Sequence, residues 1–157
     1  MTSQIDELDA RLIAAMRAHP RVGLVEVARQ LGVARGTVQA RLAKLEARGI
    51  VTGHGPEVDP AALGYPILAF MLLELAQGRL EEAVRVLAGV PEVIEAHAIS
   101  GPHDLLCRLV ARDTEHLQTL VNRILATPAI HRSTSYIVLS HQVGPRTAPL
   151  VAAAGRA

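Results

Sequence analysis

A row of polar and basic side chains recurs at helical spacing within residues 35–48. The row is spaced four, three and four residues apart, and it consists of Thr37, Arg41, Lys44 and Arg48. This row flanks the face of the helix that lies opposite the expected core, and that face is smooth, because it holds only Gly36, Ala40, Ala43 and Ala47. Small side chains permit close approach to a DNA major groove, while cations reach phosphates or guanine edges. We therefore predict DNA contacts from Arg35, Gly36, Thr37, Gln39, Ala40, Arg41, Lys44 and Arg48; a solvated amphipathic helix is the alternative.

Two further helices and a turn are needed to position this segment. Apolar spacing predicts a supporting helix over residues 6–19 and a second helix over residues 24–31. Gly32 is expected to end the second helix, since glycine adopts the left-handed conformation of a helix C-cap. The third helix closes at Gly49 and turns a core stripe inward, formed by Val38, Leu42 and Leu45. The three helices together predict a helix-turn-helix.

The residues after the third helix and the distribution of charge support the same prediction. Residues 50–58 (IVTGHGPEV) are expected to form two short strands around a Gly-rich turn, a wing that follows the DNA backbone. Residues 1–52 hold eight basic and five acidic residues, a net charge of +3, whereas the remainder holds eight basic and ten acidic residues, a net charge of −2. We therefore expect an anionic partner, double-stranded DNA, at the N-terminal part of the chain.

Composition predicts a folded protein with an aliphatic core. Half of the 157 residues are hydrophobic, but no apolar run reaches the roughly 18 residues of a membrane span, and the acidic N-terminus is unlike a signal peptide. A cytoplasmic protein without a membrane partner is expected. Cys107, the single cysteine, is expected to be a small buried side chain. The seven histidines lack metal-site spacing, and no nucleophile–base pair or phosphate loop is present, so we predict no metal, no cofactor and no enzymatic activity.

The second half of the chain alternates strands with helices. Strands are expected over residues 67–75, 93–100, 104–111 and 133–141, and helices over residues 79–88 and from Thr114, the expected N-cap, onward. This βαββαβ order is that of a ferredoxin-like domain, so the whole chain is predicted to be α+β. Both helices would cover one face of the sheet. Because residues 67–75 are apolar at nearly every position, the other face is expected to pack against a second subunit.

The chain is accordingly expected to have four parts. Residues 1–52 form the helix-turn-helix, and residues 53–65 form the wing and a linker. The domain boundary is expected at residues 59–66 (DPAALGYP), because two prolines and a glycine break the periodicity there. Residues 66–143 form the ferredoxin-like domain. Residues 144–157, rich in small residues and proline, are expected to be a loose tail. A two-fold dimer would present two helix-turn-helix units to paired DNA half-sites.

Over residues 5–142 the chain resembles the Lrp/AsnC family of bacterial and archaeal regulators, also called feast/famine regulators. The motifs that carry the resemblance, in order, are LDARLIAAMRAHPRV, LGVARGTVQARLAKLEARGIV, DPAALGYPILAF, VPEVIEAHAISGPHDLL and TSYIVL. The resemblance implies a winged helix-turn-helix joined to an effector domain that dimerises, with dimers assembling into octamers or other higher oligomers. It also implies a sequence-specific transcriptional regulator whose assembly or DNA affinity responds to an amino acid or a related metabolite.

In the family, the effector site lies between dimers and is built around the turn that joins the middle strands. Carried over, that site centres on Gly101 and Asp104, with Ser100, Pro102, His103, Leu105, Ser133, Thr134 and Ser135 as neighbours. Gly101 would let backbone N–H groups approach a carboxylate, and Asp104 would accept hydrogen bonds from an α-ammonium group. A plain hairpin turn with an aspartate at its edge is the alternative. His103 is expected to be a solvated turn residue, with an effector contact or a pH-sensitive group as the alternative.

Three positions depart from the family pattern, one of which is His103 in the turn. Ala34 stands where a serine usually caps the recognition helix, which costs about 1 kcal/mol of helix stability and one phosphate contact. Leu105 stands where an aromatic residue is frequent, which alters the expected pocket. The alternative function is a DNA-organising architectural protein of the same fold with little or no effector response.

Overall fold

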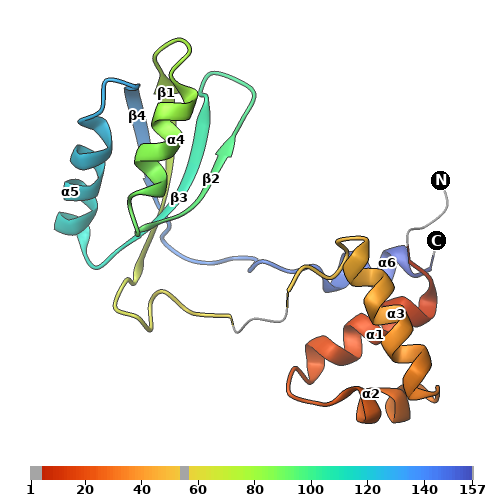
Figure 1. Ribbon diagram of the computed structural model, residues 1–157. Coiled ribbons are helices and arrows are strands. Elements are labelled where there is room, and N and C mark those ends of the chain that lie inside the picture. The colour runs from red at the N-terminus through yellow and green to blue at the C-terminus, as the bar shows by residue number, and fades with distance from the viewer. Residues whose placement is uncertain (1–4, 54–56, 157) are drawn as a thin grey trace. The chain divides into compact units, whose positions relative to one another are not determined.

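The structure, a computed structural model, describes residues 5–53 and 57–156 (Figure 1). The elements in chain order are α1 (Glu7–Ala18), α2 (Leu24–Leu31), α3 (Arg35–Ala47), β1 (Ile67–Leu75), α4 (Leu80–Ala88), β2 (Val93–Ala98), β3 (Leu105–Ala111), α5 (Thr114–Leu125), β4 (Ile130–Ile137) and α6 (Ala148–Ala154). They belong to two compact units. We call residues 1–56 with 143–157 the N-terminal unit and residues 57–142 the sheet unit. None of the helices in the described residues is long and apolar enough to span a membrane.

The first three helices of the N-terminal unit confirm the predicted helix-turn-helix. α1 begins with a capping box, in which the side chains of Asp6 and Asp9 each accept the backbone N–H of the other. α2 ends at Gly32, whose φ of 69° is left-handed. The stripe predicted to face the core from α3 is buried, namely Val38, Leu42 and Leu45. The three helices thus enclose one aliphatic core.

The predicted wing is wrong wherever the structure describes it. Residues 50–53 and 57–58 form no strand, and residues 54–56, the middle of the predicted turn, lie outside the described residues. The backbone N–H groups of Ile50 and Val51 both donate to the carbonyl oxygen of Leu45, at 2.9 and 3.3 Å, and thereby close the end of α3. Both side chains pack on the helical core. These residues therefore complete the helix instead of starting a strand ladder.

The sheet unit confirms the ferredoxin-like order. The strand order is β2-β3-β1-β4, and each neighbouring pair is antiparallel. α4 and α5 cover one face of the sheet (Figure 1), where they bury Met71, Leu105 and Ile124 with other aliphatic side chains. Cys107 lies fully inside this core, as predicted, and burial raises the pKa of its thiol to about 11.

Predicted boundaries in the sheet unit are wrong at β2, which ends at Ala98 rather than at residue 100, at β4 and at α5. β4 spans Ile130–Ile137 rather than residues 133–141, because its ladder with β1 runs from Leu75 opposite Ile130 to Ala69 opposite Ile137. The N-cap of α5 is Asp113 rather than Thr114. Its carboxylate accepts the backbone N–H of His116 at 2.7 Å, and Thr114 is already the first helical residue.

The predicted loose tail is wrong as well. Ala148–Ala154 forms α6, which packs on α1 within the N-terminal unit. The approach is close: a Cβ atom added to Gly155 would lie 2.4 Å from the Cβ of Ala10. Arg17 fastens the start of the same helix, since its Nη1 donates to the Thr147 hydroxyl at 2.9 Å. The small residues on which the prediction of a loose tail rested leave α6 without bulky side chains beside α1, and this allows the close contact.

Candidate functional site

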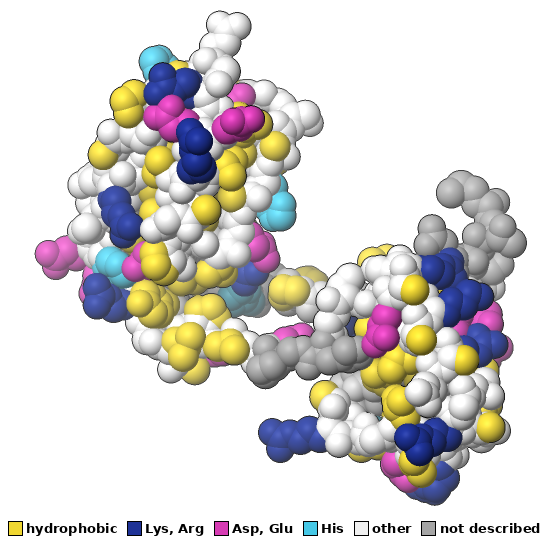
Figure 2. Space-filling view, in the orientation of Figure 1, with side chains coloured by type: hydrophobic (Ala, Val, Ile, Leu, Met, Phe, Trp, Pro, Cys, Tyr) yellow, Lys and Arg dark blue, Asp and Glu magenta, His cyan; other side chains and the backbone are white. Residues whose placement is uncertain are grey.

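The outward side of α3 carries most of the side chains predicted to contact DNA. The exposed residues are Arg35, Gly36, Thr37, Gln39, Ala40, Lys44 and Arg48. A Cβ atom at Gly36 would meet nothing within 4 Å, so the face is open where small residues were predicted to allow close approach. Figure 2 shows basic side chains at several places on the surface of the N-terminal unit. The arrangement can place cations and small polar groups against one anionic surface.

Arg41, the remaining member of the predicted row, is held by α1. Its Nη1 lies 2.6 Å from Oδ2 of Asp6 and 2.7 Å from Oδ1 of Asp9, so one guanidinium nitrogen bridges both carboxylates of the capping box. The side chain of Asp9 is 11% exposed and that of Arg41 is 31% exposed. Arg41 therefore attaches α3 to α1, and the row of cations predicted from spacing is interrupted at this position.

The electrostatics of this cluster are mutually reinforcing. The hydrogen bond from Arg41 lowers the pKa of Asp6, and the carboxylate of Asp6 in turn raises the pKa of Arg41. The pairing joins residues that lie 32 and 35 positions apart. The sequence contained one relevant signal, two aspartates three residues apart at the start of a helix, but it did not identify the cation that they hold.

The helix start itself follows the sequence. Ala34 is the N-cap of α3 and supplies no side-chain hydrogen bond, while its carbonyl oxygen accepts the N–H groups of Thr37 and Val38 at 3.0 and 3.3 Å. A serine there would satisfy one more backbone donor. Attachment through Arg41 secures the same helix from its side.

The turn between β2 and β3 places Gly101 and Asp104 at one end of the sheet. Gly101 has a φ of 124°, a conformation that favours glycine. The backbone N–H of Asp104 donates to the Leu73 carbonyl oxygen at 2.9 Å, and its Oδ2 accepts the Leu75 N–H at 2.7 Å. Within the described residues the other carboxylate oxygen, Oδ1, has no hydrogen-bond donor. Asp104 thus secures the end of β1 and still has an acceptor free for a ligand.

His103 does not match the expectation of a solvated turn residue. Its side chain is 21% exposed, and its Nε2 lies 3.9 Å from Oε1 of Glu74 on β1. Arg132 of β4, opposite Glu74 in the ladder, brings its Nη1 to 3.8 Å from the same oxygen. Sequence reasoning missed Glu74 and Arg132. The available signal was a single carboxylate near the end of an otherwise apolar strand.

The other residues expected around the turn do not form one lining. Ser133 and Ser135 lie opposite Leu73 and Met71, on the helix-covered face, whereas Thr134 belongs to the open face, because successive side chains of a strand alternate. The side chain of Leu105 is buried in the core, so only its backbone is available to a ligand. Three neighbours lie at the surface with Gly101 and Asp104: Ser100, Pro102 and the partly exposed His103.

The face of the sheet away from the helices has an apolar centre, next to which lie charged side chains such as Arg108 and Arg132. Leu68, Phe70 and Leu72 alternate with the buried side chains of β1 and are half-buried, as is Leu106 of β3. The strand is therefore fully buried on one face alone in this single chain.

No group of three or more His, Cys, Asp or Glu side chains suited to a metal ion occurs in residues 5–53 and 57–156.

Comparison with known proteins covers both units. Residues 5–46 match the AsnC-type helix-turn-helix domain, and residues 68–147 match the Lrp/AsnC ligand binding domain. The HTH-type transcriptional regulator FL11 of Pyrococcus horikoshii is 29% identical over 139 residues, which cover 88% of this chain and 92% of the relative. The regulatory protein AsnC of Escherichia coli K12 is 30% identical over 141 residues, which cover 88% and 93%.

Solved structures agree with these matches. E. coli AsnC aligns with a TM-score of 0.84 at 29% identity, covering 92% of this chain and 99% of that one. The regulator NMB0573 of Neisseria meningitidis, solved as a complex with L-Met, has the same fold, with a TM-score of 0.81 at 20% identity over 90% of this chain and 94% of that one. The relatives are named as regulators, and this chain is a transcriptional regulator with a ligand-binding domain, not an enzyme. The chain belongs to the Lrp/AsnC family.

Proposed function

We propose that this regulator binds double-stranded DNA through α3, and that an amino acid or a related small metabolite at the turn of residues 100–104 changes its assembly or its affinity for DNA. The observation that carries the proposal is the presence, in one chain, of an AsnC-type helix-turn-helix and an Lrp/AsnC ligand binding domain. The first supplies the DNA-facing helix, and the second supplies the effector turn.

For DNA, the proposed contacts are the exposed side chains of α3. Gly36 and Ala40 let the helix approach the floor of the major groove, and Arg35, Thr37, Gln39, Lys44 and Arg48 reach bases or phosphates. Arg41 is a positioning residue in this proposal, because its guanidinium is committed to Asp6 and Asp9. Most of the salt dependence of binding is therefore assigned to the other cations.

For the effector, the turn offers partners for both charges of an amino acid. The free Oδ1 of Asp104 suits an α-ammonium group, and backbone N–H groups beside Gly101 suit an α-carboxylate. Arg132 and His103 place further cationic or polar groups near the same end of the sheet, on either side of Glu74. The related NMB0573 was solved with L-Met, which supports an amino acid as the ligand class.

Self-association is part of the proposal. The open sheet face has a half-buried apolar strip, Leu68, Phe70 and Leu72, and apolar strips of this kind are often covered by a partner. A second copy packed there would form a homodimer with two helix-turn-helix units, which fits paired half-sites in DNA. Further assembly of dimers, up to an octamer, belongs to the same proposal.

One observation favours a second candidate function. Asp104 already serves the fold by accepting the Leu75 N–H, so the Gly101–Asp104 turn has a structural reason to exist without an effector. A DNA-organising protein with little effector response would keep the same turn. The two candidates differ in whether a ligand changes DNA binding.

The experiment begins with a thermal-shift screen of the twenty amino acids on the full chain. A ligand that binds only the folded state raises its melting temperature. DNA selected from a random library is then titrated, with and without each stabilising amino acid, by fluorescence anisotropy. The proposal expects at least one amino acid to change the Kd or the size of the complex. DNA binding that none of the twenty alters would favour the architectural candidate, and absence of DNA binding would refute both.

A further inference from the structure

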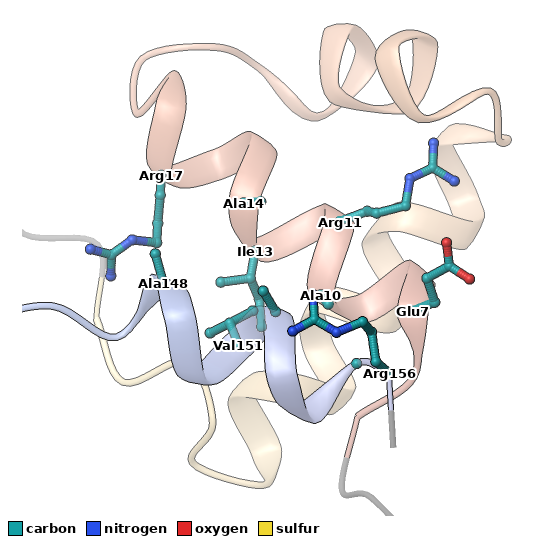
Figure 3. A pocket seen from close by; sticks show the side chains of 11 residues that line it. Glu7, Ala10, Arg11, Ile13, Ala14, Arg17, Ala148, Val151 and Arg156 are labelled. Atoms are coloured by element: carbon teal, nitrogen blue, oxygen red, sulfur yellow. The ribbon is translucent and has the colours of Figure 1, made fainter.

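The N-terminal unit contains a cavity of about 330 Å³ between α1 and α6 (Figure 3). Its volume lies near the lower end of the roughly 300–1,000 Å³ that small-molecule sites occupy. The floor is apolar, with Ile13 and Ala14 from α1 facing Val151 and Ala152 from α6. Ile13 and Val151 point toward one another in the centre of Figure 3. The cavity thus has the size and the apolar surface to hold the body of a small ligand.

The rim of the cavity is cationic. Arg11, Arg17 and Arg156 line it, and Glu7 is the one acidic residue among its described lining residues. Figure 3 shows Arg156 reaching back along the groove, Arg17 beside Ala148 at the other end, and Arg11 extending away from α6. Two guanidinium groups are therefore available along an apolar groove, which complements a ligand that is apolar and negatively charged.

The two groove arginines are available for an anion. Nη1 of Arg17 donates to the Thr147 hydroxyl at 2.9 Å, which orients the guanidinium and leaves its other N–H groups unused by that bond. In the part of the chain that the structure describes, no ion pair involves Arg17 or Arg156. A guanidinium of this kind pairs with a carboxylate through two parallel hydrogen bonds.

The groove forms where α6 packs on α1. At Gly155 and Ala10 the two segments are as close as packing permits, and Val151 is packed against the core of the unit. The space arises beside that contact, where alanine side chains line both helices. A ligand in this space would touch α1 and α6 together, so binding would hold α6 in place.

We propose that the α1–α6 groove binds a small amphipathic monocarboxylic acid. Its branched or aromatic body lies against Ile13 and Val151, and its carboxylate pairs with Arg156, whose side chain reaches back along the groove (Figure 3). The groove consists entirely of residues of the N-terminal unit, so this site is distinct from the effector turn at Gly101. The three arginines at the rim outnumber the single carboxylate of Glu7 and disfavour a cationic centre on the ligand, which separates this class from amines.

The test uses the full chain and two probes of the same shape, 3-phenylpropionate and its neutral amide. Calorimetry measures affinity, and ¹H–¹⁵N spectra identify the amides that shift. We expect the acid to bind saturably, to shift amides of α1 and α6, and to bind about threefold more tightly than the amide, because ion pairs with exposed guanidinium groups are weakened by solvent screening. Equal affinity of the two probes, or acid-dependent shifts only in residues 100–104, would overturn the proposal.

Variants locate the site. Replacing Arg17 and Arg156 together by glutamine should weaken binding of the acid about threefold and leave binding of the amide unchanged. Ala152→Leu should fill the groove and weaken both probes. The matched control is Arg85→Gln, an exposed arginine of α4 that is outside the groove, and it should bind like the parent chain. If Ala152→Leu fails to fold, the acid–amide comparison on the parent chain still decides.

A second copy of the chain is the competing occupant. It would appear as α1 and α6 amide shifts that depend on protein concentration and are insensitive to the acid. That result would overturn the proposal, as would unchanged acid binding in the double arginine variant.

Discussion

The variant Arg41→Ala tests whether Arg41 holds α3 in position or contacts DNA directly. In the parent chain one guanidinium nitrogen lies 2.6 Å from Asp6 and 2.7 Å from Asp9. The variant leaves the carboxylate of Asp9, whose side chain is only 11% exposed, without its cation. We therefore expect Arg41→Ala to destabilise the N-terminal unit, while its effect on DNA contacts is small.

The expected loss of unfolding free energy follows from how exposed each of the two ion pairs is. The side chain of Asp6 is 56% exposed, so its pair with Arg41 is worth about 0.5 kcal/mol after solvent screening. The pair with the buried Asp9 is a charged hydrogen bond, for which about 1.5–3 kcal/mol is typical. Arg41→Ala should therefore lower the free energy of unfolding by roughly 2–3 kcal/mol. For a unit of this size, about 4–8 °C per kcal/mol predicts a Tm lower by roughly 8–24 °C.

Thermal unfolding followed by circular dichroism measures the loss, with Lys44→Ala as the matched control. Lys44 is exposed on the same helix, so its removal should cost less than about 0.5 kcal/mol. In DNA titrations below the Tm of both variants, Lys44→Ala should reduce the salt slope by about one unit, and Arg41→Ala should leave that slope nearly unchanged. Equal stability of the two variants, or an equal loss of slope, would refute the assignment of Arg41 as a positioning residue.

Acid titration provides an independent check on the same cluster. Arg41 holds the pKa of Asp6 below its ordinary value of 3.8. A carboxyl group whose folded-state pKa is depressed contributes stability above its unfolded-state pKa, and this contribution is lost as the pH falls through the folded-state value. The stability difference between the parent chain and Arg41→Ala should therefore be constant near neutral pH and should narrow below about pH 4.

Three further predictions follow from close contacts and burial. Gly155→Ala should cost about 1–3 kcal/mol in chemical denaturation, because its Cβ would meet the Cβ of Ala10 at 2.4 Å, while Gly144→Ala, with nothing within 4 Å, should cost far less. Asp104→Asn should keep an acceptor for the Leu75 N–H and hence the melting temperature, but lose the amino-acid response in thermal shift; a retained response would refute the effector assignment. Cys107 should resist thiol reagents until the chain unfolds, since burial raises its pKa to about 11; rapid labelling of the folded chain would contradict this.

Features that depend on local spacing were predictable from the sequence. Helical periodicity and the left-handed Gly32 defined the helix-turn-helix, because both act within a few residues. The alternation of apolar strands with amphipathic helices defined the ferredoxin-like order, since few topologies accommodate it. The motif order also identified the family.

Features that depend on distant partners were decided by the tertiary structure. Spacing placed Arg41 in a cationic row, but its guanidinium binds two carboxylates that lie more than 30 residues away in the chain. The small residues of α6 suggested a loose tail, yet they form a helix because α1 offers a surface that Gly155 can approach. A helix of seven residues has little stability of its own and depends on such packing. Local pattern thus determined which elements form, and long-range contact decided which side chains remain free to bind.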